Sequence, residues 1–232
     1  LRVSVIAALL NNVIHNTQHG EAHGALFEIA PVFLQKETAD IREEKRPFFE
    51  TTQLGLVLWG GEPAKNWQKN MGQSLFYELK GVVEGVLDQW RFKSFKFESA
   101  KDAPGYFHPG QTARLVIEGK PAGFVGVLHP AVQESLDLKT SVVVCELSTE
   151  VLFTGQPRIT KAKPIPKFPK VDRDVALLAP TELAAQDIGD ALLKAAGQLA
   201  KDCELFDLYE GDKLPKGKKS VAYRLTYQDP SK

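Results

Sequence analysis

The first two thirds of the chain alternate between helical and strand-like hydrophobic patterns. Apolar residues recur at helical spacing in 1–14, and those in 72–90 form one continuous apolar stripe, so we expect an amphipathic helix in each range. Short apolar runs bounded by turn residues are typical of strands. The strands expected here cover residues 25–34, 54–59, 92–97, 112–117, 122–128 and 142–147. Because few helices separate them, the pattern predicts an α+β fold with an antiparallel sheet flanked by helices.

The C-terminal part of the chain shows the order strand, helix, strand, strand. A helix over 182–196 is expected to begin after an N-cap at Thr181 and to end at Gly197. The expected strands cover 173–179, 202–209 and 219–228. The last of them places Val221, Tyr223, Leu225 and Tyr227 on one face and Ser220, Ala222, Arg224 and Thr226 on the other. A ferredoxin-like fold would continue with a further helix and strand, so we expect that last αβ unit to be missing.

A stretch rich in proline and lysine separates these two parts and predicts a linker over residues 156–169. The expected domains are therefore 1–155 and 170–232. The whole chain has 29 Lys and Arg against 29 Asp and Glu, so no global field selects nucleic acid or membrane. From residue 158 onward, however, 14 basic residues face 11 acidic ones, which favours the C-terminal part as the partner of a polyanion.

The two cysteines, Cys145 and Cys203, stand far apart and outside any metal-binding or redox spacing. Such sparse thiols suit a reducing compartment, so we expect a cytoplasmic protein. The longest apolar run, residues 3–10, is too short to span a bilayer, and no signal peptide is visible, so no membrane partner is expected. Since the chain begins with leucine, we expect it to be a piece of a longer protein.

The sequence Gly217-Lys218-Lys219-Ser220 resembles the end of a phosphate-binding loop, but its context is wrong. In such a loop the second glycine is the fifth residue after the first, and a helix follows. Here Gly217 is the sixth residue after Gly211, and a strand follows. We interpret the segment as a hairpin connection with solvated lysines.

Two groups of histidines are candidates for functional sites. His15, His19 and His23 have a spacing that could hold zinc on a helix, but Gly20 and Gly24 argue against a helix, so a polar loop without a metal is expected. His108 and His129 each precede a proline, which favours extended backbone at a strand edge. Neither has a nucleophile elbow or a cysteine partner in the sequence, so we expect no catalytic residue.

Aromatic and basic residues alternate in the C-terminal part. Aromatic rings can stack on unpaired bases, and lysines such as Lys219 attract the phosphates between them. Only half of a strand's side chains can face a ligand. Tyr209 and Ser220 are therefore better candidates for RNA contacts than Tyr223, which shares the apolar face of its strand.

Taken together, several motifs resemble the C-terminal half of the β subunits of bacterial phenylalanyl-tRNA synthetases. The resemblance covers nearly the whole chain. The motifs in the larger part are LLNNVIHNTQ, ALFEIAPVF, LGLVLWG, LFYELKGVVEGVL, YFHPGQTARLVIEGKPAGFVGVLHPAV and CELSTEVL. Those in the smaller part are IPKFPKVDRDVALL and LFDLYEGDKLPKGKKSVAYRLTYQDP. They are weak singly and specific in combination.

This resemblance implies a class II synthetase-like, non-catalytic core domain that packs on an α subunit in an α2β2 assembly. It also implies a ferredoxin-fold domain that binds the anticodon of tRNA(Phe). Carried over from the family, the RNA contacts would come from Ala176, Asp207, Tyr209 and Ser220, joined by Lys219 from the basic pattern described above. No cofactor is expected in this chain, whereas ATP and Mg²⁺ would serve the whole ligase.

One departure from class II catalytic sites matters. The strand that should hold the ATP α-phosphate, HGALFE at 23–28, has no arginine, and no arginine follows GFVG at 123–126. Without these cations the developing charge on phosphate is unsupported, so the chain alone is predicted not to activate an amino acid. Two alternatives remain open: a protein-interaction adaptor, and a stand-alone enzyme that uses His108 and His129.

Overall fold

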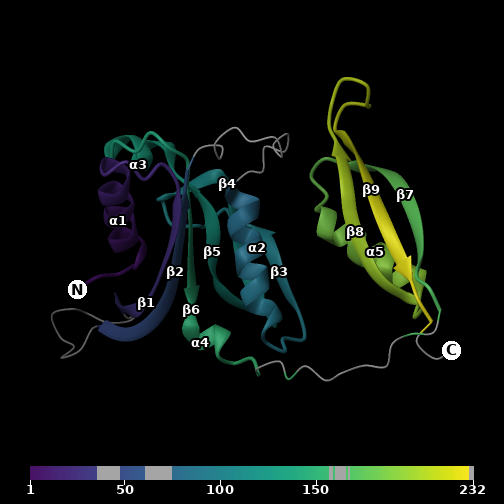
Figure 1. The fold of residues 1–232 in the computed structure, drawn as a ribbon, viewed down its shortest axis with the longest axis horizontal. Helices are drawn as coiled ribbons and strands as arrows, with labels where there is room; N and C mark the ends of the chain where they lie inside the picture. The colour runs from purple at the N-terminus through teal and green to yellow at the C-terminus, as the bar shows by residue number, and fades with distance from the viewer. Residues whose placement is uncertain (36–47, 61–74, 157–158, 160–165, 167, 230–232) are drawn as a thin grey trace. The chain divides into compact units, whose positions relative to one another are not determined.

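The computed structural model describes residues 1–35, 48–60, 75–156, 159, 166 and 168–229, and these form two compact units, Leu1–Ile159 and Thr160–Lys232 (Figure 1). Each unit combines helices with an antiparallel sheet, so the α+β prediction is confirmed. The predicted linker, 156–169, falls mostly outside the described residues, and the domain bounds stay a prediction. None of the helices in the described ranges has the length and apolar character that a membrane crossing requires.

The larger unit is built on a six-stranded sheet in the order β1-β2-β6-β5-β4-β3, in which every pair is antiparallel. The strands are β1 (Gly24–Gln35), β2 (Phe48–Trp59), β3 (Phe95–Ser99), β4 (Phe107–Ile117), β5 (Lys120–Leu128) and β6 (Val142–Ser148). The helices are α1 (Ile6–Gln18), α2 (Leu75–Asp88), α3 (Pro130–Ser135) and α4 (Thr149–Leu152).

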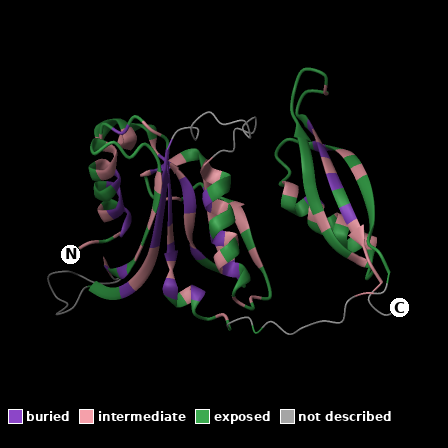
Figure 2. Ribbon diagram, viewed as in Figure 1, coloured by how far each residue is buried: buried purple, intermediate pink, exposed green. Residues whose placement is uncertain are grey.

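The two faces of this sheet carry separate hydrophobic cores. Val144 of β6 packs with Leu9 of α1 on one face, and its neighbour Cys145 packs with Leu79 and Val83 of α2 on the other. Since successive side chains of a strand point to opposite faces, α1 and α2 cover opposite sides of the sheet. Most residues of β6 and of the second half of β2 are consequently buried (Figure 2).

Several sequence-based bounds need correction. The first helix begins at Ile6, after the N-cap residue Val5, and continues to Gln18. Its polar last turn includes Thr17, whose hydroxyl donates to the carbonyl oxygens of Val13 and Ile14. β2 and β4 begin earlier than predicted because their first residues pair with β1 and β5 although their side chains do not alternate. The short helices α3 and α4 were missed, since so few residues carry no helical periodicity.

The smaller unit has the predicted order: β7 (Val171–Pro180), α5 (Ala185–Ala196), β8 (Ala200–Tyr209) and β9 (Lys218–Tyr227). Its sheet has the strand order β7-β9-β8, so β9 is the central strand. Helix α5 packs Ile188 against Val221 and Tyr223 of β9, and the Tyr223 hydroxyl donates a 2.6 Å hydrogen bond to the carbonyl oxygen of Ala185. The predicted buried face of β9 is thus confirmed.

Thr181 does not cap this helix. The N-cap residue is Ala184, with no side-chain hydrogen bond, and α5 therefore begins three residues later than predicted. The Thr181 backbone is instead bound to the β8–β9 hairpin: its N–H donates to the carbonyl oxygen of Gly217. Gly197 ends the helix as expected, with a φ of 80°.

Candidate nucleic-acid interface

The strand register brings four of the five predicted RNA-binding residues onto one face of the small sheet. Ala176 of β7 and Asp207 of β8 both lie opposite Ala222 of β9, and in the neighbouring row Tyr209 lies opposite Ser220. Directly paired residues of antiparallel strands share a face, with Cα atoms about 4.5–5.5 Å apart. This face, opposite to the one covered by α5, is called the open face below.

Tyr209 presents its ring on the open face. The side chain is 42% exposed, and the ring lies over Gly211 at the start of the hairpin between β8 and β9. Ser220 is half-buried and Asp207 is exposed. An aromatic ring, a hydroxyl and a carboxylate are thus accessible together, beside two alanines that leave room above the sheet. Such a set can stack on an unpaired base and hydrogen-bond its edge.

Lys219, the fifth predicted residue, is separated from the other four. It is two residues before Val221 in β9, so its side chain lies on the same side of the sheet as α5, and the residue is only 7% exposed. Its ammonium group donates a 3.0 Å hydrogen bond to the carbonyl oxygen of Thr181. Lys219 is therefore not part of the open face. The alternation of side chains along β9 already predicts this burial, because Lys219 falls on the same face as the apolar residues that follow it.

Two exposed apolar residues of the interface were not singled out from the sequence. Leu178 lies opposite Ser220 and is 60% exposed, and Phe206, at an irregularity in β8, is 48% exposed. The guanidinium of Arg224 lies 5.1 Å from the centre of the Phe206 ring. Leu178 could have been found from the sequence, because it is two residues after Ala176 in the same strand and therefore lies on the same face.

Arg224 is held by a carboxylate. Its Nε and Nη2 donate to the two carboxylate oxygens of Asp174, both at 2.9 Å. The hydrogen bond from Arg224 lowers the pKa of Asp174, and the same bond raises the pKa of Arg224. Thr226 donates in the same way to Asp172, at 2.8 Å. The cation that the sequence placed on this face is therefore already neutralised.

The open face as a whole is acidic. By register, five exposed carboxylates lie on it or at its edge, against two cations. The carboxylates are Asp172, Asp174, Asp202, Glu204 and Asp207, and the cations are Arg224 and Lys218. A surface of this charge repels phosphate groups, so it is suited to contact bases and not the nucleic-acid backbone.

The described arginines of the larger unit all have partners within the chain. Arg114 is ion-paired with Asp102 and lies 5.7 Å from the Phe124 ring, and Arg2 binds Glu28 at 2.8 Å. Arg91 lines a hollow with Trp90, but its Nη2 donates to the carbonyl oxygen of Ile159.

His108 and His129 each bind a nearby backbone N–H through one ring nitrogen. His108 accepts a hydrogen bond from the Gly110 N–H at 3.0 Å, and His129 accepts one from the Ala131 N–H at 3.1 Å, which caps α3. Both imidazoles are therefore engaged with the backbone. A surface hollow includes His108 and is otherwise lined mainly by polar side chains such as Gln111, Gln133 and Lys139.

The loop expected around His15 is wrong in part, since residues up to Gln18 are helical and the His15 and His19 ring centres are 4.2 Å apart. Gly20 does not interrupt this helix, because it lies after the last helical residue, Gln18, and has a φ of 93°. Within the described ranges, no three potential metal ligands gather at one point.

The segment 210–217 joins β8 to β9 as a hairpin connection, as predicted.

Comparisons with known proteins cover both units. Residues 1–149 match a family model described as phenylalanyl tRNA synthetase beta chain CLM domain, and residues 166–232 match one described as ferredoxin-fold anticodon binding domain. The chain is 35% identical to the phenylalanine–tRNA ligase beta subunit of Bdellovibrio bacteriovorus over 99% of its length. It is 39% identical to the subunit of the same name from Geobacillus kaustophilus over 100% of its length. It spans 28% of the length of each of these relatives.

Proposed function

Because the chain belongs to the family of phenylalanyl-tRNA synthetase β chains, we propose that it is part of a synthetase β subunit whose smaller unit recognises the anticodon of tRNA(Phe). The family resemblance seen in the sequence is confirmed by these matches. The observation that carries the proposal is the exposed ring of Tyr209 beside Ser220 and Asp207 on the open face.

Each of these side chains has a chemical role in the proposal. The ring of Tyr209 stacks on an anticodon base that is turned out of the RNA stack. The Asp207 carboxylate accepts hydrogen bonds from base amino or imino groups, and the Ser220 hydroxyl can donate or accept. Ala176 and Ala222 have side chains small enough to let the base edge approach the sheet. These contacts read bases and not phosphates.

The larger unit has a different role in the proposal. It is a non-catalytic domain that packs on the α subunit in an α2β2 assembly in the cytoplasm. ATP and Mg²⁺ are bound by the α subunit, where phenylalanine is activated and transferred. The paired state of Arg2 and Arg114 supports this division, because charge developing on a phosphate would find no free cation near them. Accordingly, this chain alone should show no phenylalanine-dependent ATP–pyrophosphate exchange.

The proposal is tested by replacing Tyr209 in the whole enzyme. Tyr209→Ala should weaken tRNA binding and aminoacylation at limiting tRNA roughly 5- to 150-fold, because a lost base stack costs about 1–3 kcal/mol. Tyr209→Phe keeps the ring and should retain most of the activity. Tyr77→Ala, which removes an exposed tyrosine of the larger unit, is the matched control. Unchanged kinetics for Tyr209→Ala would reject the assignment.

A further inference from the structure

One end of the open face carries an exposed lysine that pairs with no described carboxylate. Lys218 is two residues before Ser220 in β9, so its side chain lies on the open face. It is paired with Pro180 of β7 and lies one row beyond Tyr209. Two residues along a strand are separated by roughly 6.6 Å. At the other end of β9, Arg224 is neutralised by Asp174 and acidic residues follow. The charge of the open face therefore changes from basic to acidic along β9.

Two more lysines continue the basic end into the hairpin. Lys213 and Lys216 are exposed, as is Lys218, and none of the three forms an ion pair with a described residue. Glu210 and Asp212 lie on the β8 side of the same connection. The free cations consequently gather toward the β9 side, where the strand leads to Ser220.

Backbone hydrogen bonds give this connection a defined shape. The Leu214 N–H donates to the Gly211 carbonyl at 3.0 Å, and the Lys218 N–H donates to the Pro215 carbonyl at 3.1 Å. Gly217, with a φ of 74°, makes the turn into β9 and accepts from the Thr181 N–H. The lysines are thus presented from an ordered turn joined to the rest of the unit, which lowers the entropic cost of binding an anion.

From this charge distribution we infer that Lys213, Lys216 and Lys218, here called the hairpin lysines, bind the phosphate groups of the RNA strand whose base stacks on Tyr209. The inference rests on the proposed function. Phosphates cannot lie over the acidic open face, so the backbone of a strand that places a base on Tyr209 must pass on the hairpin side. Lysine ammonium groups attract phosphates as point charges without reading the base sequence.

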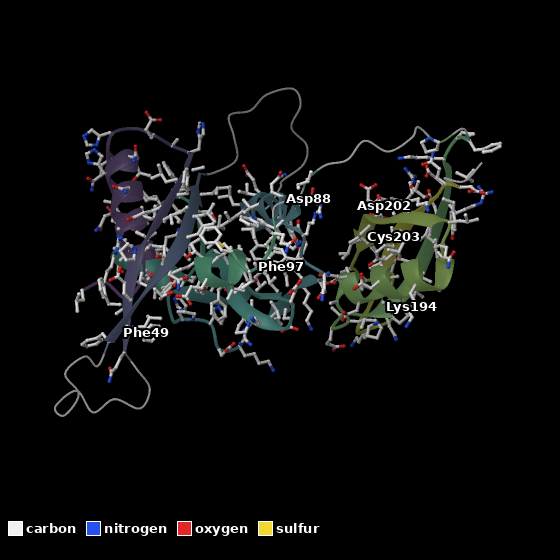
Figure 3. The ribbon with its side chains drawn as sticks, turned by 90° about the horizontal axis from the view of Figure 1, so that it is seen from below. Phe49, Asp88, Phe97, Lys194, Asp202 and Cys203 are labelled. Carbon is white, nitrogen blue, oxygen red and sulfur yellow. The ribbon has the colours of Figure 1, made fainter. Side chains whose placement is uncertain are left out.

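The test measures tRNA binding to the whole α2β2 enzyme at several salt concentrations. The triple variant Lys213→Gln, Lys216→Gln, Lys218→Gln should bind more weakly at low salt. Its slope of log affinity against log salt should be smaller in magnitude by roughly 2, since each phosphate contact to a single strand contributes about 0.7. The control Lys194→Gln, Lys201→Gln removes exposed lysines elsewhere, Lys194 being on α5 (Figure 3), and should leave the slope unchanged.

A parallel measurement on Tyr209→Ala separates the two claims. Loss of affinity with an unchanged salt slope is expected for this variant, because a stacked ring releases no counterions. If Tyr209→Ala weakens binding but the triple variant keeps the wild-type slope, the role of the hairpin lysines is rejected and the proposed function stands. If neither variant differs from wild type, the proposed function fails and this inference fails with it.

Discussion

The Tyr209 ring lies so close to Gly211 that a Cβ at position 211 would stand 2.6 Å from the tyrosine hydroxyl oxygen and 2.8 Å from Cζ. Both atoms are at the far end of a side chain, so the ring and not the backbone would have to move. The backbone of Gly211 is outside the left-handed region, which means that alanine can adopt it. Gly211 is therefore a positioning residue for the Tyr209 ring.

We predict that Gly211→Ala lowers tRNA affinity while leaving the thermal stability of the protein nearly unchanged. The loss should reach about tenfold at most, because the displaced ring keeps part of a stack worth about 1–3 kcal/mol. Binding titrations with the whole enzyme check the prediction. In a Tyr209→Ala background the same substitution should have no further effect, and an additive loss there would show that Gly211 acts by another route.

The buried lysine of the small unit should affect stability and not RNA binding. Lys219→Met keeps the aliphatic stem but leaves the Thr181 carbonyl without its 3.0 Å hydrogen bond, so the free energy of unfolding should fall by about 1 kcal/mol. Urea denaturation measures this change. Lys194→Met, at an exposed site, serves as control. A reduced salt slope in tRNA binding by Lys219→Met would instead return this residue to the interface.

A carboxylate joins three separate segments of the larger unit. Glu146 accepts hydrogen bonds from the Val5 N–H at 2.8 Å, from the Ser4 hydroxyl at 3.0 Å and from the Tyr106 hydroxyl at 2.9 Å. Burial raises the pKa of Tyr106 above its ordinary value of 10.0, and the charge of Glu146 raises it further. The network thus stabilises the protonated phenol.

This network predicts alkaline destabilisation. Because the folded pKa of Tyr106 is raised, its contribution to stability is fully present below pH 10 and is lost as the pH rises above that value, by up to about 1.4 kcal/mol per pH unit. Denaturation midpoints at pH 8 and pH 10.5 should therefore differ more for the wild type than for Tyr106→Phe. Equal differences would mean that the phenol does not stay protonated in the folded protein.

The two thiols should differ in reactivity. Cys145 is fully buried between the paired residues Leu56 and Val125. Cys203, on β8 (Figure 3), is half-buried. Burial is the main cause that raises the pKa of both thiols, followed by Glu146 for Cys145 and by Asp202 for Cys203. Since the thiolate is the nucleophile, a thiol reagent should label Cys203 in the folded protein, and faster as the pH rises above 9.

Mass spectrometry of the labelled chain identifies the site. Cys145 should be labelled only after denaturation, and Cys203→Ser should remove the labelling of the folded protein. Labelling of Cys145 under native conditions would contradict the packing of the large core.

Much of the fold follows from short-range pattern. The stripe that includes Leu79, Val83 and Leu87 predicts α2 because residues three and four apart share one face of a helix. The short helix α3 could not be found in this way, since it depends on the His129 ring that accepts a hydrogen bond from Ala131. The start of α5 was also misplaced, because the Thr181 backbone is bound by residues of the hairpin some forty positions away.

The sequence by itself determined the two faces of β9, and with them the burial of Val221 and Tyr223, because a period of two is a property of the extended backbone. It also determined the family, through motifs that are contiguous in the chain. Only the tertiary structure decided which cations are free: Arg224 is neutralised by Asp174, fifty residues earlier, while Lys218 is not. That difference depends on the strand order β7-β9-β8, since long-range pairing alone brings such charges within hydrogen-bonding distance.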